Sequence, residues 1–532
     1  MPCCKAEEYG GWCNGLDSYD VEGKQYCVFH APKLGVGVTT AEEFNELVYA
    51  RIIRAKHISE PCNLSGTVFK GDISFSRFDK DNPLPEVNFS YAEFSGVAYF
   101  SGAQFGGRAN FRGARFSGEV YLFDNTQFSG GVDFSGALFS GKASFFIKTQ
   151  FGGKANFSGA QFSGEADFSV ARFSGEAHFL DAQFGGRANF RGARFSGEAD
   201  FSKAKFSGEA GFTQAEFSGE AYFRDAKFSG EAGFFRVRFG READFSKVVF
   251  CKPVDFSKAT FKEKAVFYGI ETEFPEFTGA FIGLDIDDKI RFENVNLKKI
   301  SFLDTDLRKV DFINCKFPER KGQEVLYDEI ELFNKKKEKS AEEFKAELKK
   351  VEALYRLLKQ KYKEGHNEAR ASHWHYQEKE MQRHGVKGFL SETGKDIVKY
   401  LKGTEVKEFF SHIKRLFSSV RAKSKEFFLW LFLNLYYLTS GYGEEFERAL
   451  VVLICLFLVF SVVLTFFLTP DSNPSYGIAN GFIDTFKYAT FQKDYALKPS
   501  NIRGEFIKIL AQMLIPIQTA LFIMALRNRF RR

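Results

Sequence analysis

The chain has 532 residues, of which 67 are Phe and 47 are Gly, and aromatic residues make up 17% of it. Lys and Arg (74) outnumber Asp and Glu (68) by only six, which argues against a dedicated nucleic-acid-binding protein, because such proteins carry a larger basic excess. Eight Cys in so long a chain do not make a disulfide scaffold. Twelve Pro are too few for a long disordered linker.

A Cys-rich segment occupies residues 1–36. Cys27-x-x-His30 has the spacing of a zinc-ligand pair, and Cys13 with Cys4 or Cys3 would complete a tetrahedral site. The segment has too few apolar residues to fold alone, so a bound metal would supply its folding energy. We predict a closed, structural zinc site formed by Cys4, Cys13, Cys27 and His30, with Cys3 as the alternative to Cys4. The competing interpretation is a set of reduced surface thiols.

A short helix is predicted within residues 37–60. Thr40 and Glu43 have the spacing of a capping box, in which each side chain bonds to the backbone of the other residue. Apolar residues follow at helical intervals. We expect this helix to cover the open end of the repeat region, because a bare terminal coil would expose an edge that invites pairing with another chain.

Regularly spaced Phe residues dominate residues 61–318. Between Phe157 and Phe267 the intervals alternate between five and six residues, and Ala or Val almost always stands two positions earlier. From Phe292 to Phe317 the interval is a strict five. Neither interval fits a helix or an ordinary strand, so the chain must turn a corner every few residues and point one large and one small apolar residue inward. Stacked coils would satisfy each other's backbone polar groups at the ~4.8 Å strand spacing.

The motifs ADFSG, ANFRG and VDFIN resemble the pentapeptide-repeat family. That resemblance implies a right-handed quadrilateral β-helix, here with about 20–22 residues per coil and about a dozen coils. The sixth residue in alternate repeats departs from the family pattern and leaves the coil shape open. Some members imitate DNA, which needs a negative surface. Residues 157–267 carry 16 Lys and Arg against 15 Asp and Glu, so we favour a scaffold that binds a cytoplasmic protein partner, with no nucleic acid involved.

A charged helical connector is predicted for residues 319–425. Its Lys- and Glu-rich sequence contains a helical stripe from Phe344 to Leu358, and a second helix should follow after Gly365. The segment resembles the helical part that often joins pentapeptide repeats to a membrane channel module. Metal binding by the nearby His residues is a weaker interpretation than a packed helical hairpin.

The last part, residues 426–532, has the features of a membrane domain. Residues 449–468 contain no charge and are long enough to span a bilayer, and residues 506–526 form a second apolar stretch. Residues 426–439 are too short to cross and suit an interfacial helix. Polar residues are costly in lipid, so we take the interruptions of the second span as candidates to line a pore: Lys508, Gln512, Pro516 and Gln518.

The loop between the spans resembles the re-entrant pore loop, here residues 480–500, of a two-transmembrane potassium-channel-like module. The filter of that family should follow Thr490 and Phe491, but the chain continues Gln492, Lys493, Asp494, Tyr495 without a glycine. Carbonyl-lined filters need glycine for their backbone angles. Potassium selectivity by that device is therefore not expected.

Together these patterns predict a multidomain protein: a right-handed β-helix, a helical connector and a two-span α-helical membrane domain. The favoured function is an oligomeric ion-channel-like protein, with a tetramer expected, whose repeat domain senses or recruits a partner. The alternative is a membrane-anchored scaffold without ion conduction. Basic residues flank both spans on the outer ends of the pair, which predicts an inner (plasma) membrane protein with both termini in the cytoplasm. No nucleophile–base pair or phosphate loop is evident, so we expect no enzyme.

Overall fold

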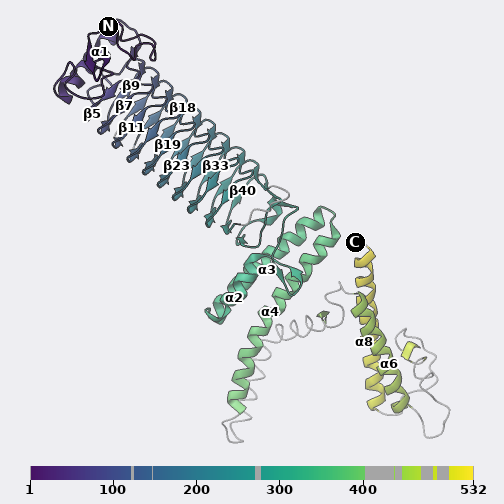
Figure 1. Cartoon of the computed structure of the whole chain (residues 1–532). Helices are drawn as coiled ribbons and strands as arrows, with labels where there is room; N and C mark the ends of the chain where they lie inside the picture. Colours follow the sequence, from purple (N-terminus) through teal and green to yellow (C-terminus); the bar gives the residue numbers. More distant parts are fainter. Residues whose placement is uncertain are drawn as a thin grey trace. The chain divides into compact units, whose positions relative to one another are not determined.

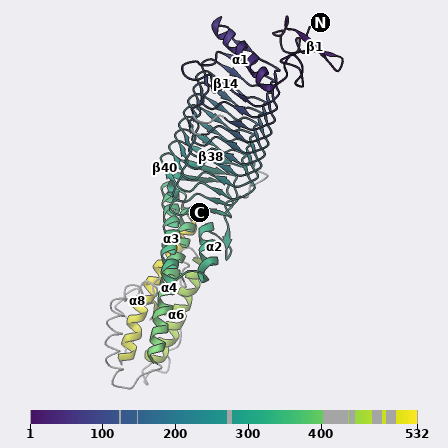
Figure 2. The same cartoon turned by 90° about the vertical axis from the view of Figure 1, so that its left-hand side faces the viewer.

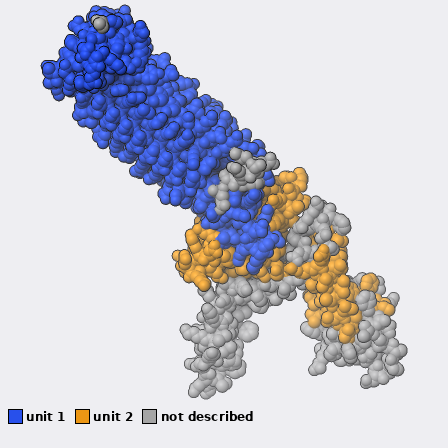
Figure 3. Space-filling view, viewed as in Figure 1, with its two compact units in different colours: residues 1–330 blue, residues 331–532 orange. Residues whose placement is uncertain are grey.

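The structure, a computed structural model, describes residues 2–121, 125–146, 148–269, 277–401, 436–437, 446–468, 483, 485–487 and 502–530. The chain divides into two compact units, Met1–Ile330 and Glu331–Arg532 (Figure 3). The first unit contains the predicted Cys-rich segment, the capping helix and the β-helix. The second contains most of the predicted connector and the two apolar helices.

The repeat region of the first unit forms a β-helix with four sides (Figures 1 and 2). One coil consists of four two-residue strands: β18 (Ala155–Asn156), β19 (Gln161–Phe162), β20 (Ala166–Asp167) and β21 (Arg172–Phe173). The next coil begins with β22 (Ala177–His178), whose Ala177 pairs in parallel with Ala155. One coil therefore contains two five-residue and two six-residue intervals, as the alternating Phe spacing predicted.

The coils stack into four parallel sheets. The first sheet has twelve strands, from β3 (Cys62–Asn63) to β43 (Val310–Ile313). The second has nine, from β4 (Val68–Phe69) to β35 (Val249–Phe250). The third has eleven, from β5 (Ile73–Ser74) to β42 (Ile300–Ser301), and the fourth has nine, from β9 (Gln104–Phe105) to β40 (Asp285–Ile286). Twelve strands in the first sheet confirm the prediction of about a dozen coils.

Irregular spacing in the sequence corresponds to coils of unusual length. Ala265 pairs with Ile290, so the coil that contains the disturbed stretch is longer than the regular coils before it. Ile290 pairs with Val310, so the following coil is shorter than the regular ones, because all four of its sides have the strict five-residue interval. The strand pairing between coils thus follows the spacing of the Phe residues in the sequence.

Five-residue intervals turn through a tight corner that needs a left-handed residue. In the corner from Phe168 to Ala171, the Ala171 N–H donates to the Phe168 carbonyl (3.1 Å) and Val170 has a φ of 60°. This is the arrangement of a type II turn, whose third residue requires a positive φ. Gly159 holds the same position in the preceding five-residue corner, with a φ of 66°.

Six-residue intervals use a different corner, and this explains the departure from the five-residue repeat. Gly208 stands in the bend between the second and third sheets, directly against the preceding coil. A Cβ atom built there would lie 2.5 Å from the Gly186 carbonyl oxygen. Gly186 has the same relation to Gly164, at 2.5 Å. The extra residue therefore lets backbones of neighbouring coils meet where no side chain fits.

Replacing Gly208 by alanine is expected to destabilise the β-helix by about 2 kcal/mol, because the added methyl group must push two backbones apart. Gly211→Ala is the matched control, since the nearest atom to its Cβ is Asn189 Oδ1 at 3.8 Å. Thermal unfolding of the purified chain, followed by circular dichroism, measures both. Equal losses in the two variants would contradict this account of the six-residue corner.

Phe rings fill the interior in columns that run along the rod. Phe179 stacks on Phe157 with ring centroids 4.9 Å apart and on Phe201 at 4.7 Å, each pair within 1° of parallel. Neighbouring columns meet edge to face, as Phe179 does with Phe190 (5.4 Å, 87°). Ala at the other inward position, for example Ala182, leaves the space that these rings need.

Both ends of the β-helix are covered. The predicted capping helix is α1 (Ala41–His57), and its capping box is confirmed, since the Glu43 N–H donates to Thr40 Oγ1 at 3.2 Å. At the other end the hairpin of β44 (Glu319–Arg320) and β45 (Gln323–Glu324) leads into α2 (Tyr327–Asn334). The buried Asp328 carboxylate accepts from the Phe302 N–H of the last coil (3.0 Å).

The second unit contains a helical hairpin of α3 (Ala341–Glu364) and α4 (Glu368–Leu401), which agrees with the helical hairpin predicted for the connector. Glu378 of α4 is buried and accepts from Arg356 Nε at 3.2 Å and from Lys359 Nζ. Burial alone would raise the pKa of Glu378, but His375, Lys359 and Arg356 outweigh it and lower the pKa to about 2. Charged partners therefore hold this carboxylate ionised between the two helices.

Two apolar helices follow, α6 (Phe446–Leu468) and α8 (Ile502–Phe530), and they pack on each other. Phe460 of α6 lies with Ala511 and Ile515 of α8 in the seam between them. Within the described residues one stretch, Ile509–Arg527, is long and apolar enough to cross a membrane. The predicted interfacial helix lies outside the described residues apart from 436–437, and so does most of the predicted pore loop.

Candidate metal centre

Three cysteines and a histidine meet at the N-terminal end of the first unit. Cys27 ends β2 (Lys24–Cys27), which forms a hairpin with β1 (Ser18–Val21). The turn after β2 brings His30 back toward Cys27, since the His30 N–H donates to the Cys27 carbonyl (3.1 Å). Cys3 and Cys13 approach from the preceding loops, and all four side chains are buried.

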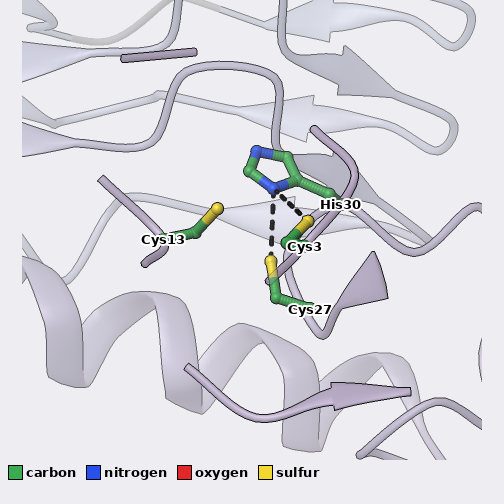
Figure 4. Close-up of side chains that lie close together, drawn as sticks. All are labelled: Cys3, Cys13, Cys27 and His30. Atoms are coloured by element: carbon green, nitrogen blue, oxygen red, sulfur yellow. Dashed lines mark hydrogen bonds between the residues drawn. The ribbon is translucent and has the colours of Figure 1, made fainter. Parts of the chain in front are cut away.

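The donor atoms of these four residues converge closely enough to hold one metal ion (Figure 4). They lie within 4.8 Å of one another. His30 Nδ1 is 3.2 Å from Cys27 Sγ and 3.5 Å from Cys3 Sγ. A zinc ion with sulfur ligands at ~2.3 Å needs its donors roughly 3.6–3.8 Å apart. Three thiols and one imidazole match zinc in number and chemistry, and small shifts of the side chains would bring the four donors to this spacing.

The structure corrects one predicted ligand: Cys3 joins the cluster instead of Cys4. The Cys4 side chain is exposed, while its N–H donates to the Gln25 carbonyl (2.7 Å) alongside β2. That backbone bond fixes the direction of the segment and turns consecutive side chains to different sides. Cys3, which is 5% exposed, then points at the other three ligands. The sequence carried no signal that separated two adjacent cysteines.

His30 has a fixed tautomer in this arrangement. Its Nε2 lies 3.1 Å from the Ser65 carbonyl oxygen, which can only accept a hydrogen bond. Nε2 must therefore carry the proton, and the lone pair of Nδ1 faces the sulfur atoms. A backbone carbonyl on the far nitrogen is the usual way in which proteins orient a metal-binding histidine.

Burial affects the protonation of the cluster. It raises the pKa of Cys13 to about 12, helped by the neighbouring Cys27 and Cys3, and raises that of Cys27 to about 11. It lowers the pKa of His30, which therefore stays neutral. Without a metal the thiols of Cys13 and Cys27 are protonated, so metal binding must release their protons. A zinc ion would supply the positive charge that three buried thiolates need.

The Cys-rich segment also provides hydrogen-bond partners for the open edge of the first coil. The Val68 N–H donates to the Phe29 carbonyl (2.8 Å), as it would to a preceding coil. The Ser65 carbonyl accepts from both Trp12 Nε1 (3.1 Å) and His30. His30 therefore connects the four candidate ligands directly to the edge of the β-helix.

Helix α1 covers the remaining edge carbonyls. Arg51 Nε donates to Asn63 (3.1 Å), Asn45 Nδ2 to Asp72 (2.9 Å) and the Tyr49 hydroxyl to Ser74 (2.7 Å). The guanidinium of Arg51 also lies 4.3 Å from the Trp12 ring, which ties α1 to the Cys-rich segment. The sequence gives no local indication of these capping donors, because their partners lie in the first coil.

The predicted pore-lining residues all lie on α8, but they do not share one environment. Gln518 is buried, and its Nε2 donates to the Ala449 carbonyl of α6 at 2.9 Å. Gln512 and Pro516 are half-buried on α8, which also contains Lys508. The predicted filter residues lie outside the described part of the chain: Thr490, Phe491, Gln492, Lys493, Asp494 and Tyr495.

Comparison with known proteins identifies the repeats. Residues 85–122, 146–194 and 190–238 match the family described as pentapeptide repeats (9 copies). These stretches of the β-helix contain pentapeptide repeats. Neither the curated proteins nor the solved structures contain a match to this chain. The pentapeptide repeats thus account for the regularly spaced Phe residues. The candidate metal centre and the apolar helices have no counterpart in this family match and are described from their own residues.

Proposed function

We propose that this protein is a membrane-anchored scaffold. In this proposal the zinc-capped pentapeptide-repeat domain presents a rigid interaction surface, and α6 and α8 anchor it in the lipid bilayer. The observation that carries the proposal is the apolar surface that the two helices leave exposed. On α6, Val451 is 58% exposed and Leu458 53%; on α8, Met513 is 58% exposed and Ile523 57%. A contiguous exposed apolar surface of this kind is typical of lipid or protein contact.

Polar groups on the helix pair support the same proposal. Gln518 points away from the exposed apolar side and into the seam, where it bonds to Ala449. The Ser461 hydroxyl donates to the Phe457 carbonyl of its own helix, α6. Backbone and side-chain polar atoms that are satisfied inside the helix pair are what the hydrocarbon core of a bilayer requires.

Vesicle flotation of the full chain tests the anchor. We expect the chain to float with phosphatidylcholine vesicles and to stay with them in high salt and at alkaline pH. A triple variant, Val451→Glu, Ile454→Glu and Leu458→Glu, should lose flotation, because charges on the lipid-facing side are costly. The matched control places one Glu at the exposed Val170 of the β-helix and should float normally. A wild-type chain that stays in the aqueous fraction would contradict the proposal.

An ion-channel-like pore is the second candidate, and one contact favours it. Ser461 Oγ lies 3.4 Å from Thr485 Oγ1, and both residues are buried. Thr485 belongs to the connection between the two helices, yet it lies beside α6 several residues before that helix ends. A connection that returns along its own helix is what the predicted re-entrant loop requires.

Planar-bilayer recording of the purified chain separates the two candidates. A pore predicts currents whose ion preference changes when Lys493 is replaced by Glu, because a charge in the loop would face the permeating ion. A scaffold without a pore predicts no current from either the wild-type chain or the Lys493→Glu variant. Homo-oligomerisation around an axis, with a tetramer expected, belongs to the pore candidate and can be read from particle symmetry.

A further inference from the structure

A stripe of positive charge runs along one side of the pentapeptide-repeat domain. It consists of the outward residues of the fourth sheet and of the corner that precedes each of its strands, between Arg172 and Lys258. We call it the basic stripe. It contains six cations and one anion, Glu216, and all six cations are exposed: Arg172, Arg191, Arg194, Arg236, Arg238 and Lys258.

The stripe follows from the coil geometry. Arg172 pairs with Arg194 in the next coil, Arg194 with Glu216, and Glu216 with Arg238. Side chains one coil apart are thus about 4.8 Å apart along the rod. The neighbouring third sheet instead points Asp167 and Asp255 outward. Residues 157–267 have almost no net charge as a whole, so the fold concentrates positive charge on one side.

Few cations of the basic stripe have an acidic partner. Several cations elsewhere on the rod pair with an acidic residue of a neighbouring coil, as Lys142 does with Glu165 (3.0 Å) and Arg187 with Glu209 (3.4 Å). Within the stripe, and among the residues that the structure describes, only Arg194 has such a partner, Glu216 at 3.8 Å. Like charges stacked across strands repel each other. The stripe therefore favours binding to a surface of opposite charge.

One outward aromatic residue lies within the stripe. Phe235 occupies a corner position at which the adjacent coils carry Thr213 and Ser257, so it is outside the ring columns of the core. The Arg236 guanidinium lies 5.2 Å from its ring. Interfacial segments combine Lys and Arg with apolar side chains such as Phe, whereas an acidic peptide would require only the cations.

We propose that the basic stripe docks the pentapeptide-repeat domain on a bilayer surface that contains anionic phospholipids. This inference rests on the proposed membrane anchor, which would hold the domain near such a surface. The flat outer face of a parallel sheet suits a planar partner, and several Lys and Arg side chains within a Debye length of anionic headgroups act together.

Arginine footprinting on the full chain tests the docking. The chain is incorporated in vesicles of phosphatidylcholine alone or of phosphatidylcholine with phosphatidylglycerol, and phenylglyoxal modification is followed by mass spectrometry. Arg172, Arg194 and Arg238 should react several-fold more slowly in the anionic vesicles, and high salt should abolish the difference. Arg112, exposed at the corner between the first and second sheets, is the internal control and should react equally in both.

A triple variant provides the second arm. Arg172→Gln, Arg194→Gln and Arg238→Gln together should remove the protection of Arg236, while Lys205→Gln with Lys227→Gln on the second sheet should leave it intact. Protection by soluble polyglutamate but not by anionic vesicles would overturn the lipid assignment in favour of an acidic protein.

The flotation of the same samples separates this inference from the anchor. A chain absent from both vesicle fractions contradicts the anchor, and the docking proposal fails with it. A chain that floats but whose stripe arginines react equally in neutral and anionic vesicles contradicts the docking proposal alone.

Discussion

Replacing Cys27 by serine is expected to weaken zinc binding by at least about a hundredfold and to release the N-terminal segment from the β-helix. Cys27 supplies one of four converging donors and also begins the turn that returns His30. Without the metal, Cys13 stays protonated and the segment has little apolar core of its own. Elemental analysis of the purified chain, and the cobalt–thiolate absorption after cobalt substitution, measure the loss.

Two further variants make this prediction specific. Cys3→Ser should behave like Cys27→Ser, while the matched control Cys4→Ser should keep one zinc per chain, since Cys4 is exposed outside the cluster. Hydrogen exchange around Ser65 should rise only in the first two, because His30 then loses the orientation that directs Nε2 at the Ser65 carbonyl. Loss of zinc in Cys4→Ser with retention in Cys3→Ser would contradict the assignment.

Replacing Phe201 by alanine is expected to cost about 3–5 kcal/mol of unfolding free energy. Its ring is completely buried between Phe179 (4.7 Å) and Phe223 (5.1 Å) in its own column. It also meets Phe190 of the adjacent column edge to face at 5.2 Å. The rigid stack cannot collapse into the space left behind, so the cavity persists and adds to the lost burial. Denaturant unfolding of the purified chain measures the change.

Phe235→Ala is the control for that substitution, because Phe235 lies at a corner outside the columns and should cost less than about 1 kcal/mol. In a stacked solenoid each coil contacts only its neighbours. Hydrogen exchange in the Phe201 variant should therefore increase mainly between Phe179 and Phe223. A uniform increase along the rod, or equal losses in the two variants, would contradict the column model of the core.

Short-range patterns in the sequence predicted the parts of this protein that depend on a repeating local interaction. The alternating Phe intervals predicted the length of each coil because every interval is one side of the coil, and the register reproduces them. Thr40 and Glu43 predicted the start of α1 because a capping box involves only four residues. Cys27 and His30 predicted a metal-ligand pair because one turn brings them together.

Only the tertiary structure decided the features that depend on direction or on distant neighbours. It selected Cys3 over Cys4, because the pairing of the Cys4 backbone with Gln25 determines which side chain points inward. It explained the sixth residue of alternate repeats, because the contact of Gly208 with Gly186 exists only between stacked coils. It also gathered Arg172, Arg194 and Arg238 on one side of a nearly neutral rod, since the side on which a charge lies depends on the coil and not on the composition.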